Sequence, residues 1–152
     1  CNQCHLETTL GWTADHLSKW YGIESPELPE EDRTISYAIL SALKGNALQR
    51  ALAAWTIGWS EAHKASTTDW VVPFLGFLLQ DNYHAVRFIA ARSLRTIPGY
   101  ENALYDSLAP KAERDQAAKV ELEPYFSATS PPLEPRTPPR LPALPGRSTG
   151  HR

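Results

Sequence analysis

The fold of this chain is decided by one stretch of its sequence, Asp81-Asn82-Tyr83-His84-Ala85-Val86-Arg87-Phe88-Ile89-Ala90-Ala91-Arg92-Ser93-Leu94. Its apolar residues recur at the spacing of one side of an α-helix, and its small alanines allow a second helix to approach closely. Asp81 stands before the helix, where we expect its side chain to cap the free backbone N–H groups. The stretch predicts a helix from about Asn82 to Thr96 that packs against a partner.

An earlier stretch repeats this pattern at a fixed interval. Three of its residues recur 37 positions later, so that Arg50, Ala53 and Ile57 correspond to Arg87, Ala90 and Leu94. An interval close to 40 residues is typical of solenoids built from helix pairs, in which stacked pairs bury a common core. The earlier copy is degenerate, because Lys44 stands where the later copy has Asp81. We therefore predict two helix pairs within residues 29–108.

The other helices of these pairs are predicted from their boundaries and periodicity. The first begins at Pro29, because proline suits the first turn and the acids that follow it suit the positive end of the helix dipole. The next two run from about Ala47 to Trp59 and from about Asp69 to Leu79. Trp55 and Trp59 lie one turn apart and are expected to pack in the core. In the first helix, the apolar residues at helical spacing are Ile35, Ile39, Leu40 and Leu43.

The C-terminal part of the chain changes in composition. Residues 109–123 are rich in Ala, Glu and Lys and predict one more charged helix. From Pro124 onward, most of the chain's 13 prolines are mixed with Ser, Thr, Arg and Gly. Such a composition buries too little apolar surface to offset the entropy of ordering, so residues 124–152 are predicted to form a disordered, proline-rich tail.

The overall composition limits the possible classes of protein. The chain has 152 residues and is 42% hydrophobic and 21% charged, which suits one modest globular domain. Its net charge of −2 gives no basic excess for binding nucleic acid. The longest apolar run, Trp70 to Leu79, is shorter than the ~18 residues that a membrane-spanning helix needs. We expect an all-α fold with neither a nucleic-acid partner nor a membrane span.

The residues that carry chemistry stand within residues 1–28. Cys1-Asn2-Gln3-Cys4-His5 has the C-x-x-C-H pattern of c-type haem attachment. Two thiols separated by two residues can add to the two vinyl groups of the porphyrin, and the adjacent histidine then becomes the proximal iron ligand. The two cysteines are the only ones in the sequence. We therefore predict that haem c is bound through Cys1, Cys4 and His5.

Other roles for a cysteine pair fit the sequence less completely. A zinc site usually takes four ligands, and the sequence has no second C-x-x-C and no H-x-x-x-H. A thioredoxin-type redox pair would follow a strand in an α/β fold, and no such strand pattern occurs. A disulfide between Cys1 and Cys4 would leave His5 without a role. Lipidation of Cys1 would consume a thiol that the haem requires.

The segment that follows the motif is aromatic and predicts a short helix. Thr13 is its expected N-cap, and Gly22 is the expected residue after its last turn. Trp12 and Trp20 flank the motif closely in sequence, so we expect both of them to contact the porphyrin. The apolar side of this helix would carry Leu17, Trp20 and Tyr21.

The second axial ligand of the iron has to be sought among the histidines. The sequence contains no methionine, which excludes His/Met coordination from within this chain. His16 is then the candidate ligand, either for this haem or for another haem, and the alternative is that it is a half-exposed helix residue. His63 is predicted in a loop, His84 on an outward helix position and His151 in the tail, so none of these three is expected to bind iron.

With these residues, the chain resembles the C-terminal part of a bacterial multihaem c-type cytochrome fused to HEAT-like (PBS-lyase-type) repeats. The resemblance rests on the cysteine motif, on residues 12–22 that follow it, and on the D-x-x-x-x-V-R-x-x-A-x-x-x-L pattern of residues 81–94. It implies electron transfer in the periplasm or outside the cell, a redox partner that docks on the repeats, and an upstream cytochrome region. The chain departs from that pattern in having a single haem motif.

Two other functions stay open beside the electron carrier. One is a HEAT-repeat scaffold for protein interaction whose haem motif is vestigial, and the other is a haem enzyme of the nitrite- or hydroxylamine-converting type. Asp81 and Arg87 look like a charged pair, but we expect them to cap and cross-link neighbouring helices. The sequence shows no Ser/His/Asp grouping, carboxylate pair or phosphate-binding glycine loop, so no catalytic residue is predicted.

Overall fold

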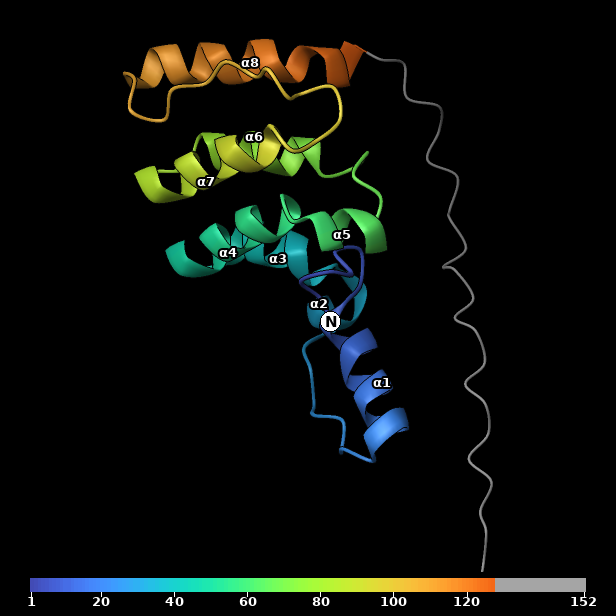
Figure 1. The fold of residues 1–152 in the computed structure, drawn as a ribbon. Helices are drawn as coiled ribbons and strands as arrows, with labels where there is room; N and C mark the ends of the chain where they lie inside the picture. The colour runs from blue at the N-terminus through green and yellow to red at the C-terminus, as the bar shows by residue number, and fades with distance from the viewer. Residues whose placement is uncertain (128–152) are drawn as a thin grey trace, which may run out of the picture.

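The computed structural model describes residues 1–127, and within them it contains eight helices and no strand. Figure 1 shows the helices stacked in layers, with α8 (Lys111–Ser127) at one end and α1 (Leu10–Tyr21) projecting from the other. The prediction of an all-α fold is confirmed. Residues 128–152, which include most of the predicted disordered tail, lie outside the described residues.

Two helix pairs form the centre of the stack. The first pair is α3 (Tyr37–Lys44) with α4 (Ala47–Ile57), and the second is α6 (Val72–Leu79) with α7 (His84–Leu94). The helices of each pair pack together, and α4 of the first pair packs on α7 of the second. The 37-residue interval therefore marks equivalent places in two stacked pairs, while the assignment to HEAT repeats stays a prediction. Four apolar positions at this interval are at most 4% exposed: Ala53, Ile57, Ala90 and Leu94.

Small residues set the spacing between the layers. Gly58 follows α4, and a Cβ atom there would collide with the backbone and side chain of Ser93 on α7. Gly76 of α6 is similarly closed in by the side chain of Leu122 on α8. Ala54 of α4 is fully buried. Larger side chains at these places would push the layers apart, because the interior is already close-packed.

Equivalent arginines tie each helix pair to the layer that follows it. Arg50 Nη1 donates to Gly45 O at 2.7 Å, and Arg87 Nη1 donates to Asn82 O at 2.9 Å, in each case to the carbonyl five residues earlier. Arg87 also donates from Nε and Nη2 to Ser107 O, which belongs to the segment that leads into α8. Each guanidinium thus fixes the turn before its own helix and reaches the layer that follows.

Asp81 does not cap α7 in the way that the sequence suggests. The residue before α7 is Tyr83, and the Asp81 carboxylate accepts its N–H at 2.8 Å. The same carboxylate pairs with Arg50 of the preceding layer, through Nε at 2.5 Å and Nη2 at 3.2 Å. Burial opposes the ionisation of Asp81, but the hydrogen bonds from Arg50 and Tyr83 outweigh it and lower its pKa. Asp81 and Arg87 do not pair through their side chains, since Arg87 binds the Asp81 carbonyl. Both residues do link neighbouring layers, as expected, Asp81 through Arg50 and Arg87 through Ser107 O.

The helix predicted to begin at Pro29 is broken in two. The first part, α2 (Glu30–Thr34), ends at Ile35, whose backbone is extended, and Ser36 then caps α3 by accepting the N–H of Ile39. The break allows the Ser36 hydroxyl to bind the N-terminal part of the chain as well. It also changes which residues are buried, because Ile35 and Leu43 are 39% and 44% exposed rather than part of the core.

A short helix that the sequence analysis missed follows α4. The sequence predicts that the second helix extends to Trp59, but α4 ends at Ile57, and α5 (Ser60–Ala65) begins after Trp59. His63 therefore lies in a helix and not in a loop, with its Nε2 bonded to Ile57 O at 2.6 Å. Trp55 stacks on Trp59 but is 43% exposed, so the prediction that Trp55 packs in the core is wrong.

The last helix is longer than its composition suggests. α8 continues through Pro124 to Ser127, whereas the sequence predicts an end at Glu123 and a disordered chain from Pro124. Its inner side carries Ala118, which is 1% exposed, and packs on α6. Packing against the second helix pair thus lets α8 continue for one turn past Glu123, although Pro124 has no backbone N–H to donate.

The first helix begins one turn earlier than predicted. Thr9 rather than Thr13 is the N-cap of α1, and its Oγ1 accepts the N–H of Trp12 at 2.9 Å. Gly22 follows the last turn in the left-handed conformation, with φ of 68°, as the sequence predicts. Of its expected apolar side, Tyr21 is 73% exposed. No helix within residues 1–127 is long and apolar enough to cross a membrane.

Candidate cofactor-attachment site

The cysteine motif forms one tight turn of the chain. The N–H groups of Cys4 and His5 both donate to Cys1 O, at 3.0 and 2.9 Å. Residues three and four positions apart lie on the same side of a helical turn, so we expect both thiols and the imidazole to lie near one face. Cys1 is exposed and Cys4 is partly exposed, and both thiols are free. The three groups that haem attachment uses are therefore all at least partly exposed.

This turn is anchored to the helices by the residue that follows it. Leu6 is fully buried, its N–H donates to Ser66 Oγ at 2.9 Å, and its carbonyl accepts from Ser36 Oγ at 2.6 Å. The N–H of Tyr37 donates to Thr8 O at 3.1 Å. Neither serine is predicted from the sequence, because a serine 30 or 60 residues away carries no signal that it will contact the motif.

Asn2 occupies one of the two variable positions of the C-x-x-C-H motif, and its side chain holds the turn by hydrogen bonds. Its side-chain amide donates to Thr8 O at 3.1 Å and to Thr9 O at 3.0 Å, and its Oδ1 accepts from Thr13 Oγ1 at 2.6 Å. Asn2 is 9% exposed, so these bonds satisfy a group that is largely out of water. Thr13, the expected N-cap, therefore binds Asn2 and does not cap the helix.

Four aromatic rings lie in successive contact, from His5 of the motif along one side of α1. The centroids of His5 and Trp12 are 5.5 Å apart, those of Trp12 and His16 are 4.1 Å apart, and those of His16 and Trp20 are 4.9 Å apart. His16 Nδ1 lies 2.8 Å from Trp12 O. Since a carbonyl only accepts, this hydrogen bond places a proton on Nδ1, and in the neutral ring Nε2 then has the lone pair that a metal ion would need.

The predicted site residues are brought together in part. Cys1, Cys4, His5 and Trp12 share one region, and His16 joins it through its contact with Trp12. Trp20 reaches the motif only through His16 and is 41% exposed. The remaining histidines lie elsewhere or outside the described residues: His63 bonds Ile57 O, His84 bonds Ser107 Oγ, and His151 is not among residues 1–127.

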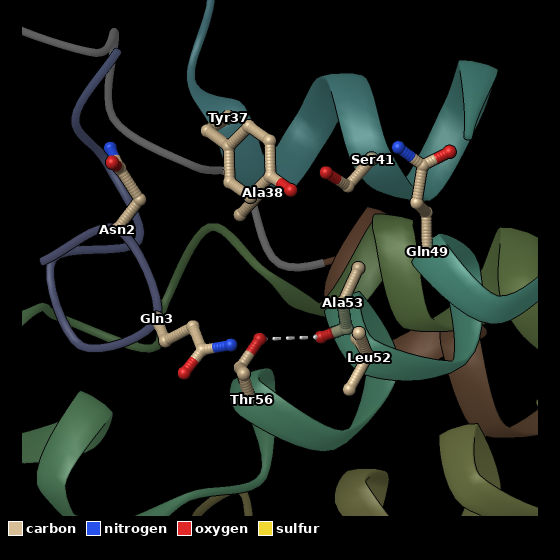
Figure 2. Close-up of a pocket in the computed structure, with 9 residues that line it drawn as sticks. All are labelled: Asn2, Gln3, Tyr37, Ala38, Ser41, Gln49, Leu52, Ala53 and Thr56. Carbon is tan, nitrogen blue, oxygen red and sulfur yellow. Dashed lines mark hydrogen bonds between the residues drawn. The ribbon is translucent and has the colours of Figure 1, made fainter. Parts of the chain in front are cut away.

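A small cavity lies between the motif and the first helix pair. Its volume is about 40 Å³, and Figure 2 shows Gln3 of the motif beside Thr56 of α4 at its edge. Ligand sites for drug-sized molecules usually measure roughly 300–1,000 Å³, so this cavity has room for water and not for a porphyrin. A haem on Cys1 and Cys4 would therefore lie outside it, against the surface. The cavity is lined by Asn2, Gln3, Tyr37, Ala38, Ser41, Gln49, Leu52, Ala53 and Thr56.

The groups in the turn fit a covalently bound haem. Haem c needs two thiols and one imidazole from a C-x-x-C-H segment, and Cys1, Cys4 and His5 supply them from one turn of the chain. The His5 side chain is 39% exposed, which leaves its ring accessible to iron. Among residues 1–127, His, Cys, Asp and Glu side chains do not gather in any group of three or more that could hold a metal ion.

Comparison of the chain with protein-family models, with curated proteins and with solved structures gives no match. Neither the resemblance to multihaem cytochromes nor that to HEAT repeats gains support from them. The function is therefore argued from the residues of the site.

Proposed function

We propose that this chain is a haem-bearing segment of a c-type cytochrome that transfers electrons. Cys1 and Cys4 hold the haem through thioether bonds, and His5 is the proximal ligand of its iron. The observation that carries the proposal is the turn itself, in which Cys4 N–H and His5 N–H both bind Cys1 O and draw the three residues together. The haem supplies one-electron chemistry when it is bound.

The chain's own residues hold this turn in place and shield one side of it. Ser36 and Ser66 hold the backbone of Leu6, directly after His5, and so restrict where the His5 imidazole can lie. Trp12 presents a large apolar ring next to His5 and suits contact with a porphyrin edge. His16, with Nε2 as its acceptor nitrogen, is the candidate for a second iron ligand.

The helix pairs are the proposed docking surface for a redox partner protein. α4 carries an exposed apolar stripe, with Leu48 69%, Leu52 42% and Trp55 43% exposed. Leu52 borders the same cavity as Gln3, so the stripe begins beside the motif. An exposed apolar patch close to a redox centre suits a transient partner. The proposal places the protein in the periplasm or outside the cell, joined to an upstream cytochrome region.

The same stripe favours a second candidate function. A helix-pair stack with an exposed apolar stripe can bind a partner without any haem, and the C-x-x-C-H turn would then be vestigial. A haem enzyme of the nitrite- or hydroxylamine-converting type is a variant of the first proposal in which the iron keeps an open ligand position.

The proposals are separated by making the chain in a bacterial periplasm with a haem-maturation system. Under the cytochrome proposal, the Soret band survives acid–acetone extraction in the wild-type protein and is lost in a Cys1→Ser/Cys4→Ser double variant. Loss of the band from the wild type on extraction overturns this proposal and favours the scaffold. Carbon monoxide binding to the reduced protein would indicate an open position, because a bis-histidine iron resists it.

A further inference from the structure

A carboxylate lies on the Nδ1 side of the proposed iron ligand. Glu7 Oε1 is 4.0 Å from His5 Nδ1. This separation is longer than a hydrogen bond, and because the His5 side chain is 39% exposed, its ring has room to turn toward the carboxylate. Haem iron takes the Nε2 atom of its proximal histidine in a C-x-x-C-H segment, which leaves Nδ1–H facing Glu7.

Glu7 is held in this position by the helix stack. Its Oε2 accepts a hydrogen bond from Ser66 Oγ, and Ser66 is 6% exposed at the end of α5. The same hydroxyl oxygen accepts the N–H of Leu6 at 2.9 Å and lies 3.1 Å from Cys4 O. One buried serine therefore joins the backbone on both sides of His5 to the carboxylate that faces its ring.

The chemistry of such a partner is well defined. A carboxylate that accepts Nδ1–H fixes the orientation of a metal-bound imidazole and makes it a stronger electron donor. The more strongly donating imidazole stabilises ferric iron relative to ferrous iron. The reduction potential therefore falls, and the negative charge of the carboxylate acts in the same direction.

We propose that Glu7, anchored by Ser66, is the positioning residue for His5 and lowers the reduction potential of the haem. This inference rests on the proposed cytochrome function. It adds that the helix stack, through α5, takes part in setting the potential and does more than present a docking surface.

The test compares the midpoint potentials of four variants of the full chain after covalent haem loading. Glu7→Gln removes the charge but keeps a group that can bind Ser66. Ser66→Ala removes the anchor, and Ser66→Thr restores a hydroxyl at the same place. Glu113→Gln is the control, because it removes one exposed carboxylate from α8 at the far end of the stack.

We expect Glu7→Gln to shift the midpoint potential upward with unchanged haem content and melting temperature, and Glu113→Gln to leave it at the wild-type value. Ser66→Ala should shift it in the same direction as Glu7→Gln, and Ser66→Thr should return it toward wild type. The shift should shrink as salt is raised, because both groups are partly exposed. A purely structural role would not show this dependence.

Two outcomes overturn the inference in distinguishable ways. If the wild type holds covalent haem and the potentials of Glu7→Gln and Glu113→Gln agree, the role of Glu7 is wrong and the cytochrome proposal stands. If the wild type holds no covalent haem, the cytochrome proposal fails and the inference fails with it.

Discussion

The N-terminal segment, residues 1–36, and the helix stack, residues 37–127, are held together by different forces. The stack buries a continuous apolar core that runs from Ala38 to Ala118, whereas Leu6 is the one apolar side chain of the core that comes from the N-terminal segment. The segment is attached instead by hydrogen bonds that cross the boundary, from Leu6 N–H to Ser66 Oγ and from Tyr37 N–H to Thr8 O, while Asn2 and Ser36 bond within the segment itself. Apolar burial therefore builds the scaffold, and a few polar contacts place the candidate site on it.

The largest effect should come from breaking the stack. Leu78 of α6 is fully buried, and Leu78→Ala should lower the free energy of unfolding by about 2–5 kcal/mol through lost burial and a residual cavity. Leu104→Ala, at a residue that is 81% exposed, is the control and should change it by less than about 0.5 kcal/mol. Denaturant titration followed by circular dichroism measures both. Similar values for the two variants would contradict the core described above.

The next effect concerns the charged link between the two helix pairs. Asp81→Asn should destabilise the stack by about 1–3 kcal/mol, because it leaves Arg50, with 19% of its side chain exposed, without its counter-charge. The lowered pKa of Asp81 makes this contribution depend on pH. It is present above the ordinary aspartate pKa of about 3.9 and is lost as the pH falls through the lower folded value.

Melting temperatures between pH 7 and pH 2 test this dependence. The difference between wild type and Asp81→Asn should be largest at neutral pH and should narrow below about pH 4. The exposed pair of Lys111 and Asp115 on α8 is the control, since Asp115→Asn removes a pair worth only about 0.3–0.5 kcal/mol. A difference for Asp81→Asn that stays constant down to pH 2 would contradict the proposed charge link.

The contrast between the two regions also explains what could be predicted from the sequence. Helix periodicity is a local signal, so it indicates the charged helix at the end and three helices of the two pairs with boundary errors of a few residues. The first predicted helix, from Pro29, instead merges α2 with α3. The 37-residue interval placed Arg50 and Arg87 correctly as equivalents. It could not show that Asp81 pairs with Arg50, because that choice depends on how the layers stack.

For the candidate site, the sequence predicted the groups but not their supports. The C-x-x-C-H spacing named Cys1, Cys4 and His5, and those residues do form one turn. Ser66 gave no such signal, since its partner Leu6 becomes a neighbour only when α5 packs beside the N-terminal segment. Groups that lie close together in the sequence can thus be predicted from it, while contacts between distant segments depend on the complete fold.

A smaller, local effect is expected at the junction of the two regions. Ser66→Ala leaves the buried N–H of Leu6 without its acceptor, which should cost about 1–3 kcal/mol. Because the loss concerns the N-terminal segment, amide hydrogen exchange should quicken in residues 1–22 and stay slow in α6 and α7. Ser60→Ala, at an exposed position of α5, is the matched control. Equal quickening throughout the chain would show that the two regions unfold together.

The smallest effect separates the two threonines at the start of α1. Thr9→Ala removes the acceptor for Trp12 N–H and should destabilise α1 by about 1 kcal/mol. Amide hydrogen exchange in the first turn of α1 should then be faster. Thr9→Ser keeps a hydroxyl and should restore most of the lost stability. Thr13→Ala should instead release Asn2, and with it the closure of the cysteine turn, because Thr13 Oγ1 donates to Asn2 Oδ1 at 2.6 Å. Exchange at the N–H of His5 then distinguishes them, since it should quicken more in Thr13→Ala than in Thr9→Ala. The reverse order would mean that helix α1 and not Asn2 keeps the motif closed.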